Sequence, residues 1–127
     1  MGDKLRVLCV DDNQEAAGCS ARLLEQAGCE VRAVHDGPSA LAEAETFRPD
    51  VCVLDLRMPG MGGEELAERL QQQAGDRPVR FVALTGLWDI ETQHRTNNAG
   101  FEEHLVKPVE PERLVEVVLG RRPAGVT

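Results

Sequence analysis

The sequence has little of three things: hydrophobic segments long enough to span a membrane, paired cysteines, and positive charge. No apolar run approaches the roughly 20 residues that a helix needs to cross a bilayer, and no signal peptide opens the chain. These two absences argue against a membrane protein. They predict a cytoplasmic location.

The cysteines, at positions 9, 19, 29 and 52, include no CxxC pair. Cys9 and Cys52 lie within apolar runs that we predict to be buried strands. Cysteines in such places act as small apolar side chains in a reducing compartment. Their spacing argues against a disulfide framework and against a zinc site.

Positive charge is scarce, because 14 Lys and Arg face 22 Asp and Glu, which gives a net charge of −8. Direct binding to nucleic acid is therefore not expected, since surfaces that bind nucleic acid are basic. The acidity suits a divalent cation or a basic partner surface, and it also keeps a domain soluble.

Length and composition predict one domain. The 127 residues are 42% hydrophobic and 28% charged, which are ordinary values for a globular protein. No repeats, linkers or low-complexity tracts are present. We predict a single domain over residues 1–127, with a core at about 4–119 and a short polar tail at 120–127.

Apolar runs and helical patterns alternate along the chain. Short apolar runs predict strands at residues 5–10, 31–34, 51–54, 80–84 and 103–106. Helical periodicity predicts helices at 14–27, 38–47, 64–74, 89–99 and 111–119. This alternation predicts an α/β fold: a doubly wound, five-stranded parallel sheet, (βα)5, with helices on both faces.

The predicted helices carry apolar residues at helical spacing, and we expect those of the third and fifth helices to face the sheet. In the first, third and fifth helices these residues are Ala16, Cys19, Leu23 and Ala27, then Leu66, Ala67 and Leu70, then Leu114, Val115 and Val118. The fourth helix has Ile90 as its only large apolar residue before Ala99. We expect that helix to be well solvated and loosely held.

Charged and polar side chains follow the ends of four predicted strands. Asp11 and Asp12 follow the first strand and Asp55 follows the third. Thr85 follows the fourth and Lys107 the fifth. Ligands of open parallel sheets bind at the carboxyl ends of the strands, so we expect these side chains to converge. Clustered carboxylates repel one another unless a cation joins them, and hard oxygen ligands suit Mg²⁺. The pattern predicts a Mg²⁺ site.

Each of these residues also has a purely structural explanation. Asp12 or Asn13 is suited to cap the first helix. Asp55 and Thr85 are suited to turns, and a lysine at a strand end can simply be solvated. The functional interpretation therefore depends on the combination.

Four motifs together resemble one known family. They are VDDN after the first strand, VLDLRMPGMGG around the third, ALTG after the fourth and LVKP after the fifth. In combination they are similar to the receiver domain of two-component response regulators, the CheY-like superfamily, which includes the receivers of hybrid histidine kinases. The resemblance covers about Lys4 to Leu119 and implies a flavodoxin-like strand order of 2-1-3-4-5.

The resemblance implies that Asp55 is a phosphoacceptor in a phosphorelay. A histidine kinase or histidine phosphotransfer protein would donate the phosphoryl group, and the Asp55 carboxylate would form an acyl phosphate with it. Asp12, Asp55 and the backbone carbonyl of Arg57 would bind Mg²⁺ directly. Asp11 would act on the metal largely through water.

The resemblance also implies that Thr85 and Lys107 bind the phosphoryl group, and that the bond between Lys107 and Pro108 is cis. Lys107 would pair with Asp55 before phosphorylation and with the phosphoryl group afterwards. Thr85 would close on the phosphoryl group, and the face made by the fourth helix, fifth strand and fifth helix would change shape. The resemblance thus describes a phosphorylation-dependent switch, not an enzyme.

Two places depart from the family's common pattern. Receivers often carry tyrosine or phenylalanine three residues before the lysine, whereas this chain has His104 there and no tyrosine at all. His104 is either a half-exposed strand residue or a switch residue whose titration makes activation pH-dependent. Arg57 and Leu87, at positions that border the hydrolytic water in the family, predict moderately slow self-dephosphorylation. His35 and His94 are expected to be surface residues.

Two other functions compete with a phosphorylated switch. Phosphatases of the haloacid dehalogenase type also use an aspartate nucleophile with Mg²⁺, but they carry a second acid two residues later, where this chain has Arg57. A receiver-like module could instead dock partners without phosphorylation. The downstream protein partner, homodimer formation and membership of a larger protein are left open by the sequence.

Overall fold

The computed structural model describes residues 4–86 and 90–120, with the side chains of 90–93 outside this description. The strands are β1 (Arg6–Val10), β2 (Glu30–Val34), β3 (Val51–Asp55), β4 (Arg80–Thr85) and β5 (Glu103–Val106). The helices are α1 (Gln14–Gln26), α2 (Gly37–Phe47), α3 (Gly63–Ala74), α4 (Ile90–Asn98) and α5 (Pro111–Leu119). Every predicted element occurs, with ends within one residue of the prediction.

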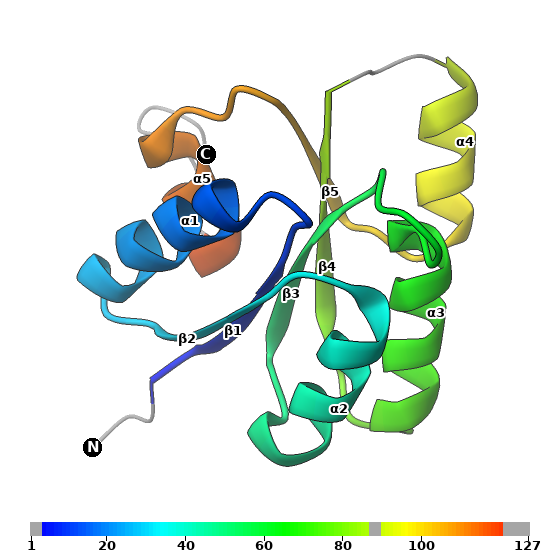
Figure 1. The fold of residues 1–127 in the computed structure, drawn as a ribbon, viewed down its shortest axis with the longest axis horizontal. Helices are drawn as coiled ribbons and strands as arrows, with labels where there is room; N and C mark the ends of the chain where they lie inside the picture. The colour runs from blue at the N-terminus through cyan, green and yellow to red at the C-terminus, as the bar shows by residue number, and fades with distance from the viewer. Residues whose placement is uncertain (1–3, 87–89, 121–127) are drawn as a thin grey trace.

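The strands form one five-stranded sheet in the order β2-β1-β3-β4-β5, and each neighbouring pair is parallel. Helices α1 and α5 cover one face, and α2, α3 and α4 cover the other (Figure 1). The doubly wound, flavodoxin-like fold is therefore confirmed. Because the chain moves outward in both directions from β1, the carboxyl ends of β1 and β3 lie side by side at the switch point of the sheet.

Hydrophobic side chains fill the space on both faces of the sheet. The layer under α2 and α3 contains Leu8, Val10, Ala40, Leu54, Leu66, Leu70 and Phe81. The layer under α1 and α5 contains Val7, Cys9, Leu24, Val53, Val82, Leu105, Leu114 and Val118. Every residue of β3 is buried, which explains its continuous apolar run.

The face of α1 that meets the sheet is shifted by one position from the helix's apolar stripe. Its buried residues are Ala17 and Leu24, whereas the apolar stripe is half-buried at Leu23 and exposed at Cys19. Both stripes have helical spacing, so periodicity alone does not decide which of them meets the sheet. In α5, Val117 is buried although it is not among the predicted residues.

The loop between β3 and α3 brings α3 against the end of β3. A Cβ atom at Gly63 would lie 2.7 Å from the backbone oxygen of Asp55, so this first residue of α3 has to be glycine. The N–H of Gly63 donates to the carbonyl of Leu56, and the N–H of Leu56 donates to the carbonyl of Leu84. The loop is thus tied to both β3 and β4, which fixes the position of Asp55.

The cysteines of the chain are unpaired. Cys9, Cys29 and Cys52 are buried, as expected of small apolar side chains, but Cys19 is exposed. Burial, with smaller contributions from Cys29 and Asp11, raises the pKa of the Cys9 thiol to about 12. Burial also raises the pKa of Cys52 and of Cys29.

Two predictions concern residues that the structure covers only in part. Over the described ranges, no helix combines the length and the apolar character that crossing a membrane requires. The predicted tail lies outside the described residues beyond position 120, so the division into core and tail stays a prediction.

Candidate functional site

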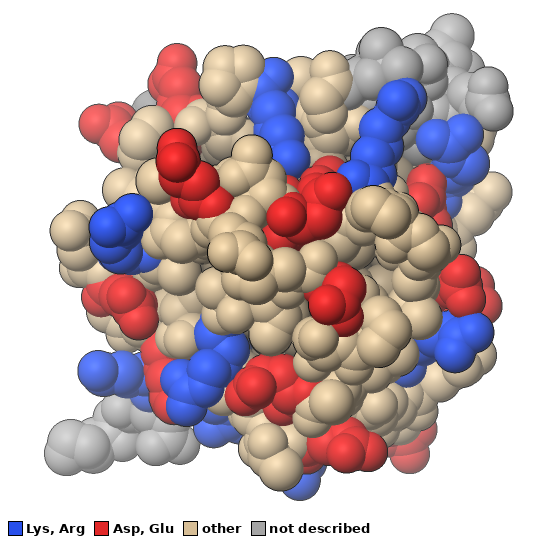
Figure 2. Space-filling model, in the orientation of Figure 1, with Lys and Arg blue, Asp and Glu red and all other residues tan. Residues whose placement is uncertain are grey.

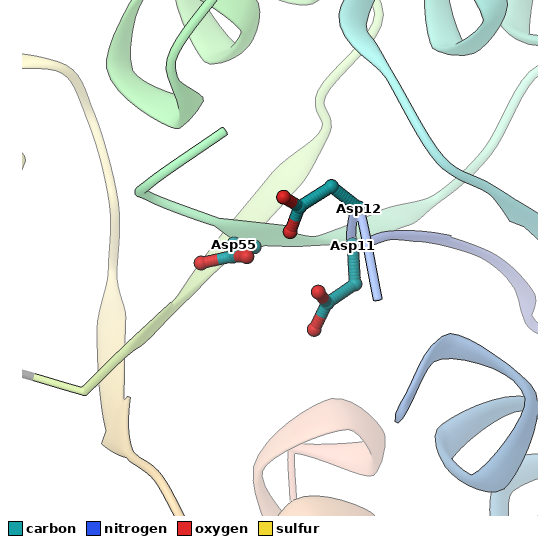
Figure 3. A group of neighbouring side chains, drawn as sticks. All are labelled: Asp11, Asp12 and Asp55. Carbon is teal, nitrogen blue, oxygen red and sulfur yellow. The ribbon is translucent and has the colours of Figure 1, made fainter. Parts of the chain in front are cut away.

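Three carboxylates meet at the carboxyl ends of β1 and β3. Asp11 and Asp12 directly follow β1, and Asp55 is the last residue of β3. One carboxylate oxygen from each lies within 4.8 Å of the other two. Figure 3 shows the Asp12 carboxylate directed toward Asp55, with the Asp11 carboxylate beside them. The structure thus brings together the three acids that the strand ends predict to converge.

Asp11 is only 3% exposed, and each of its four polar atoms has a polar partner. Its N–H donates to the carbonyl of Val34 at 3.2 Å, and its own carbonyl oxygen lies 3.1 Å from Nδ1 of His35. Its Oδ1 accepts the N–H of Asn13 at 3.0 Å, and its Oδ2 lies 3.0 Å from Nζ of Lys107. His35, predicted to be a surface residue, is half-buried, and its ring contacts this loop.

Asn13, and not Asp12, caps α1. The side-chain oxygen of Asn13 accepts the N–H of Ala16 at 3.1 Å, and the Asn13 backbone is extended, as is usual at an N-cap. The carboxylate of Asp12 is exposed and has no capping role. The structure therefore decides between the two candidate caps and leaves the Asp12 carboxylate for the acidic site.

Asp55 is 5% exposed, and its surroundings alter its acidity. Burial raises the pKa of Asp55 from 3.8 to about 6. The N–H of Arg57, 3.2 Å from Oδ1, opposes this rise, the charge of Asp11 adds to it, and Lys107 also opposes it. A buried carboxylate beside a like charge is unfavourable unless a cation neutralises it. The site therefore favours binding of positive charge.

Lys107 follows β5 and reaches two buried carboxylates. Its Nζ lies 3.0 Å from Oδ2 of Asp11 and 3.5 Å from Oδ2 of Asp55. Burial lowers the pKa of Lys107, but the hydrogen bond to Asp11 and the charge of Asp55 outweigh it, so the pKa is raised. The predicted pairing with Asp55 is present, although the contact with Asp11 is shorter. The peptide bond between Lys107 and Pro108 is cis, as predicted.

Thr85 and Arg57 lie at the same edge of the sheet. Thr85 ends β4, is 1% exposed, and accepts the N–H of Lys107 on its backbone carbonyl at 2.8 Å. The Arg57 side chain is exposed, while its backbone contacts Asp55. The structure thus brings all the site residues predicted at the strand ends to one edge. Leu87, predicted to border the hydrolytic water, lies outside the described residues.

The donor set of the three acids fits a metal ion. Their carboxylate oxygens lie close enough to share one cation, and Asp12 faces solvent, which leaves room for water ligands. Lys107 neutralises only part of the charge of three ionised carboxylates. The pKa of Asp55 is raised mainly by burial, and the charge of Asp11 adds to the rise.

A polar contact joins α4 to β5. Oγ1 of Thr96 lies 2.7 Å from Nε2 of His104, and Thr96 is fully buried. Burial lowers the pKa of His104, whereas the charge of Glu103 raises it. The sequence identified His104 but not Thr96, because a threonine in a polar helix carries no signal of burial. His35 does carry a signal in the sequence, since it directly follows a strand of the same sheet.

Acidic and basic side chains are mixed over the surface in Figure 2. Lys and Arg form no continuous area on this face.

Comparison with known families matches residues 7–119 to the response regulator receiver domain. The chain belongs to this family. Receiver domains are signalling modules of two-component systems rather than conventional enzymes, and they interact with histidine kinases or phosphotransfer proteins. The acidic edge described above lies within the matched residues.

Relatives of this receiver domain occur in larger proteins. It is 36% identical over 117 residues to the sensor histidine kinase GacS of Pseudomonas protegens. It is 32% identical over 116 residues to the DNA-binding response regulator MtrA of Mycolicibacterium paratuberculosis. The alignments cover 90% and 91% of this chain, but 13% of GacS and 50% of MtrA. The chain thus spans half or less of these relatives.

Solved receiver structures have the same fold. The chemotaxis protein CheY4 of Vibrio cholerae has a TM-score of 0.86 at 30% identity, over 94% of this chain and 100% of that one. A CheY-like receiver domain protein of Methanospirillum hungatei has a TM-score of 0.85 at 27% identity, over 93% of each chain.

Proposed function

We propose that Asp55 is the phosphoacceptor of this receiver domain. The observation that carries the proposal is the position of its carboxylate. It is almost fully buried at the end of β3, within 4.8 Å of oxygens of Asp11 and Asp12, and 3.5 Å from Nζ of Lys107. A nucleophile held among two further acids and a lysine is ready for transfer of a charged group.

The donor in this proposal is a phosphohistidine on a histidine kinase or a histidine phosphotransfer protein. An oxygen of the Asp55 carboxylate attacks the phosphorus, and the P–N bond to the donor imidazole breaks. The imidazole leaves with the electron pair, and an acyl phosphate forms on Asp55. With a pKa of about 6, Asp55 is mostly ionised, and hence nucleophilic, at neutral pH.

Asp11, Asp12, Asp55 and the backbone carbonyl of Arg57 would hold Mg²⁺. Bound Mg²⁺ supplies positive charge that stabilises the transferring phosphoryl group. The chain's own contacts orient the nucleophile. The N–H of Arg57 holds Oδ1 of Asp55 at 3.2 Å, and Asp11 is fixed at all four of its polar atoms.

Lys107 and Thr85 are assigned to phosphoryl binding. A phosphoryl group added to Asp55 comes within reach of the Lys107 ammonium, which already lies 3.5 Å from that carboxylate. Thr85 ends the neighbouring strand, and its hydroxyl would donate to a phosphoryl oxygen. Because these contacts require the phosphoryl group, they differ between the two states and can drive a conformational change.

The surface formed by α4, β5 and α5 is the proposed output of the switch. His104 lies in β5 and contacts Thr96 of α4 at 2.7 Å, so it couples the two elements. Burial lowers the pKa of His104. An effect of pH on switching is therefore expected only at pH values below the ordinary pKa of an imidazole. A cytoplasmic location is part of the proposal, since unpaired cysteines are typical of a reducing compartment.

The test is phosphorylation by a small phosphodonor. The protein is incubated with Mg²⁺ and acetyl phosphate, and its intact mass is measured beside Asp55→Asn and the control Asp76→Asn. Asp76 is an exposed aspartate in the turn after α3, away from the acidic edge. We expect one acid-labile phosphate on the parent protein and on Asp76→Asn, and none on Asp55→Asn. Chelation of Mg²⁺ with EDTA should abolish the phosphorylation.

Phosphate uptake by Asp55→Asn at the parental rate would contradict the assignment of Asp55. A folded parent protein that takes up no phosphate from acetyl phosphate would next be tested with purified histidine kinases. Failure with these donors as well would favour the alternative of a receiver-like docking module.

A further inference from the structure

His35 contacts the acidic loop from the neighbouring strand. It directly follows β2, its ring is half-buried, and its Nδ1 lies 3.1 Å from the carbonyl oxygen of Asp11. A carbonyl oxygen can only accept a hydrogen bond, so Nδ1 of His35 must carry a proton and donate. The contact therefore specifies one tautomer of the neutral ring.

This hydrogen bond acts on the peptide group between Asp11 and Asp12. Because a peptide group is planar, fixing the Asp11 carbonyl also fixes the direction of the Asp12 N–H and the position of the Asp12 Cα. The carbonyl of Val34 holds the other side of Asp11 by accepting its N–H at 3.2 Å. The end of β2 thus holds the Asp11 backbone at both its donor and its acceptor.

Asp11 and Asp12 differ in how their carboxylates are held. The Asp11 carboxylate contacts Asn13 and Lys107 directly. The Asp12 carboxylate is exposed and directed toward Asp55, so its position depends mainly on the backbone that carries it (Figure 3). A residue that sets the orientation of this backbone therefore sets the geometry of the proposed metal site.

We propose that His35 is a positioning residue, whose Nδ1–H donates to the Asp11 carbonyl and thereby holds Asp12 in place to bind the metal ion with Asp55. This inference deepens the proposed function and rests on it, since it concerns the same metal site. Groups that orient metal ligands through hydrogen bonds tune metal affinity without touching the ion. If His35 only filled space, a residue of similar bulk without a donor would serve equally well.

Two variants of similar size separate these possibilities. His35→Asn places an amide N–H at the position of Nδ1, whereas His35→Leu fills a similar volume with no donor. His94→Leu is the matched control, because His94 is an exposed histidine on α4. The Mg²⁺ dissociation constant of each protein is measured by calorimetric titration with Mg²⁺ alone.

We expect His35→Leu to weaken Mg²⁺ binding roughly tenfold, the lower end of the range for groups that orient metal ligands. His35→Asn should stay close to the parent, and His94→Leu should equal it. Thermal melts establish that each variant is folded. Equal affinity of His35→Leu and the parent, or equal weakening in the Asn and Leu variants, would overturn the role of His35.

A measurement on the unmodified protein covers the case in which His35→Leu does not fold. Long-range ¹H–¹⁵N correlations of the imidazole ring, recorded at alkaline pH, identify which nitrogen carries the proton. A proton on Nδ1 of His35 is expected, and a proton on Nε2 alone would overturn the proposal. A parent protein that binds no Mg²⁺ would overturn the metal site itself, whereas parental binding with unchanged His35→Leu would overturn only the positioning role.

Discussion

Helices α3 and α4 lie side by side on the same face of the sheet but are held there by different contacts (Figure 1). α3 buries Leu66, Ala67 and Leu70 against the core. Among the side chains of α4 that the structure describes, at residues 94–98, only Thr96 is buried, and it contacts His104. Apolar area holds α3, whereas the contacts of Arg95 and Thr96 in α4 with Glu64 and His104 are polar.

This difference between the two helices indicates different roles: α3 contributes to the stability of the domain, and α4 can take part in switching. Apolar packing has no preferred direction, and moving a packed helix opens cavities in a dense core. A hydrogen bond depends on the position of each donor and acceptor, so a small displacement weakens it steeply. α3 therefore belongs to the fixed part of the domain, while α4 can respond to a local change at the acidic edge. This fits the proposed place of α4 in the output surface.

The largest expected effect is loss of apolar packing under α3. Leu66→Ala removes a fully buried side chain and should lower the free energy of unfolding by about 3 kcal/mol. Denaturant titration at neutral and at mildly acid pH measures the effect. The loss should be similar at both pH values, because no titrating group is involved, and a loss below about 1 kcal/mol would contradict the fixed role of α3.

The second prediction concerns the charged edge, where the contacts depend on pH. Asp55→Asn should raise the free energy of unfolding by roughly 1–2 kcal/mol at neutral pH without Mg²⁺, a value discounted for solvent screening of the site. The reason is that ionised Asp55 is buried beside Asp11, and its pKa is raised to about 6. Denaturant titrations in EDTA at several pH values measure the difference.

The sign of the pH dependence follows from proton binding. Between pH 3.8 and 6 the folded parent binds more protons than the unfolded chain, so its stability falls as pH rises through this range. The gain in the free energy of unfolding of Asp55→Asn over the parent should therefore be full above pH 6 and disappear below pH 3.8. Mg²⁺ should stabilise the parent more than the variant. A variant less stable than the parent in EDTA at neutral pH would refute this prediction.

The smallest expected effect is on α4. Thr96→Val keeps the shape of the side chain but removes the hydroxyl that contacts His104, at a cost of about 1 kcal/mol. Hydrogen exchange of backbone amides should become faster in α4 and β5 and stay unchanged in α3. This experiment sharpens the contrast between the two helices, because it perturbs only the polar contact.

Arg95→Ala is the control for Thr96→Val. It removes an exposed ion pair of α4 with Glu64 at 3.1 Å, and exposed pairs contribute little, so a change below about 0.5 kcal/mol is expected. Equal acceleration of exchange in α3 and α4 by Thr96→Val, or none in either, would show that the contact with His104 does not hold α4.

The fold and the acidic edge could be predicted because they depend on local patterns. The apolar run from Val51 to Leu54 is suited to a strand buried on both faces, and its direction places Asp55 at the carboxyl edge. The other strand ends follow the same rule, and each strand occurs within one residue of its predicted ends. The identity of the family came from motifs at these same strand ends.

Details that depend on distances of a few ångströms could not be predicted. Lys107 lies between two carboxylates, and nothing in the sequence indicates that the contact with Asp11 is shorter than that with Asp55. The inward face of α1 was uncertain for a similar reason, since adjacent stripes have the same period. The contact of His35 with the Asp11 carbonyl could not be predicted either, because a histidine that follows a strand gives no indication of which backbone atom its ring meets.

The thiols of this domain differ enough in accessibility to allow site-selective labelling of the native protein. Three of them are shielded by burial, whereas Cys19 is exposed on α1. Cys19 also lines a groove of about 460 Å³ together with Lys107 and Pro108. A maleimide dye added to the native protein should therefore attach first at Cys19, without any mutation. The fluorophore would stand at the rim of that groove, where it could report the arrival of a partner beside the acidic edge.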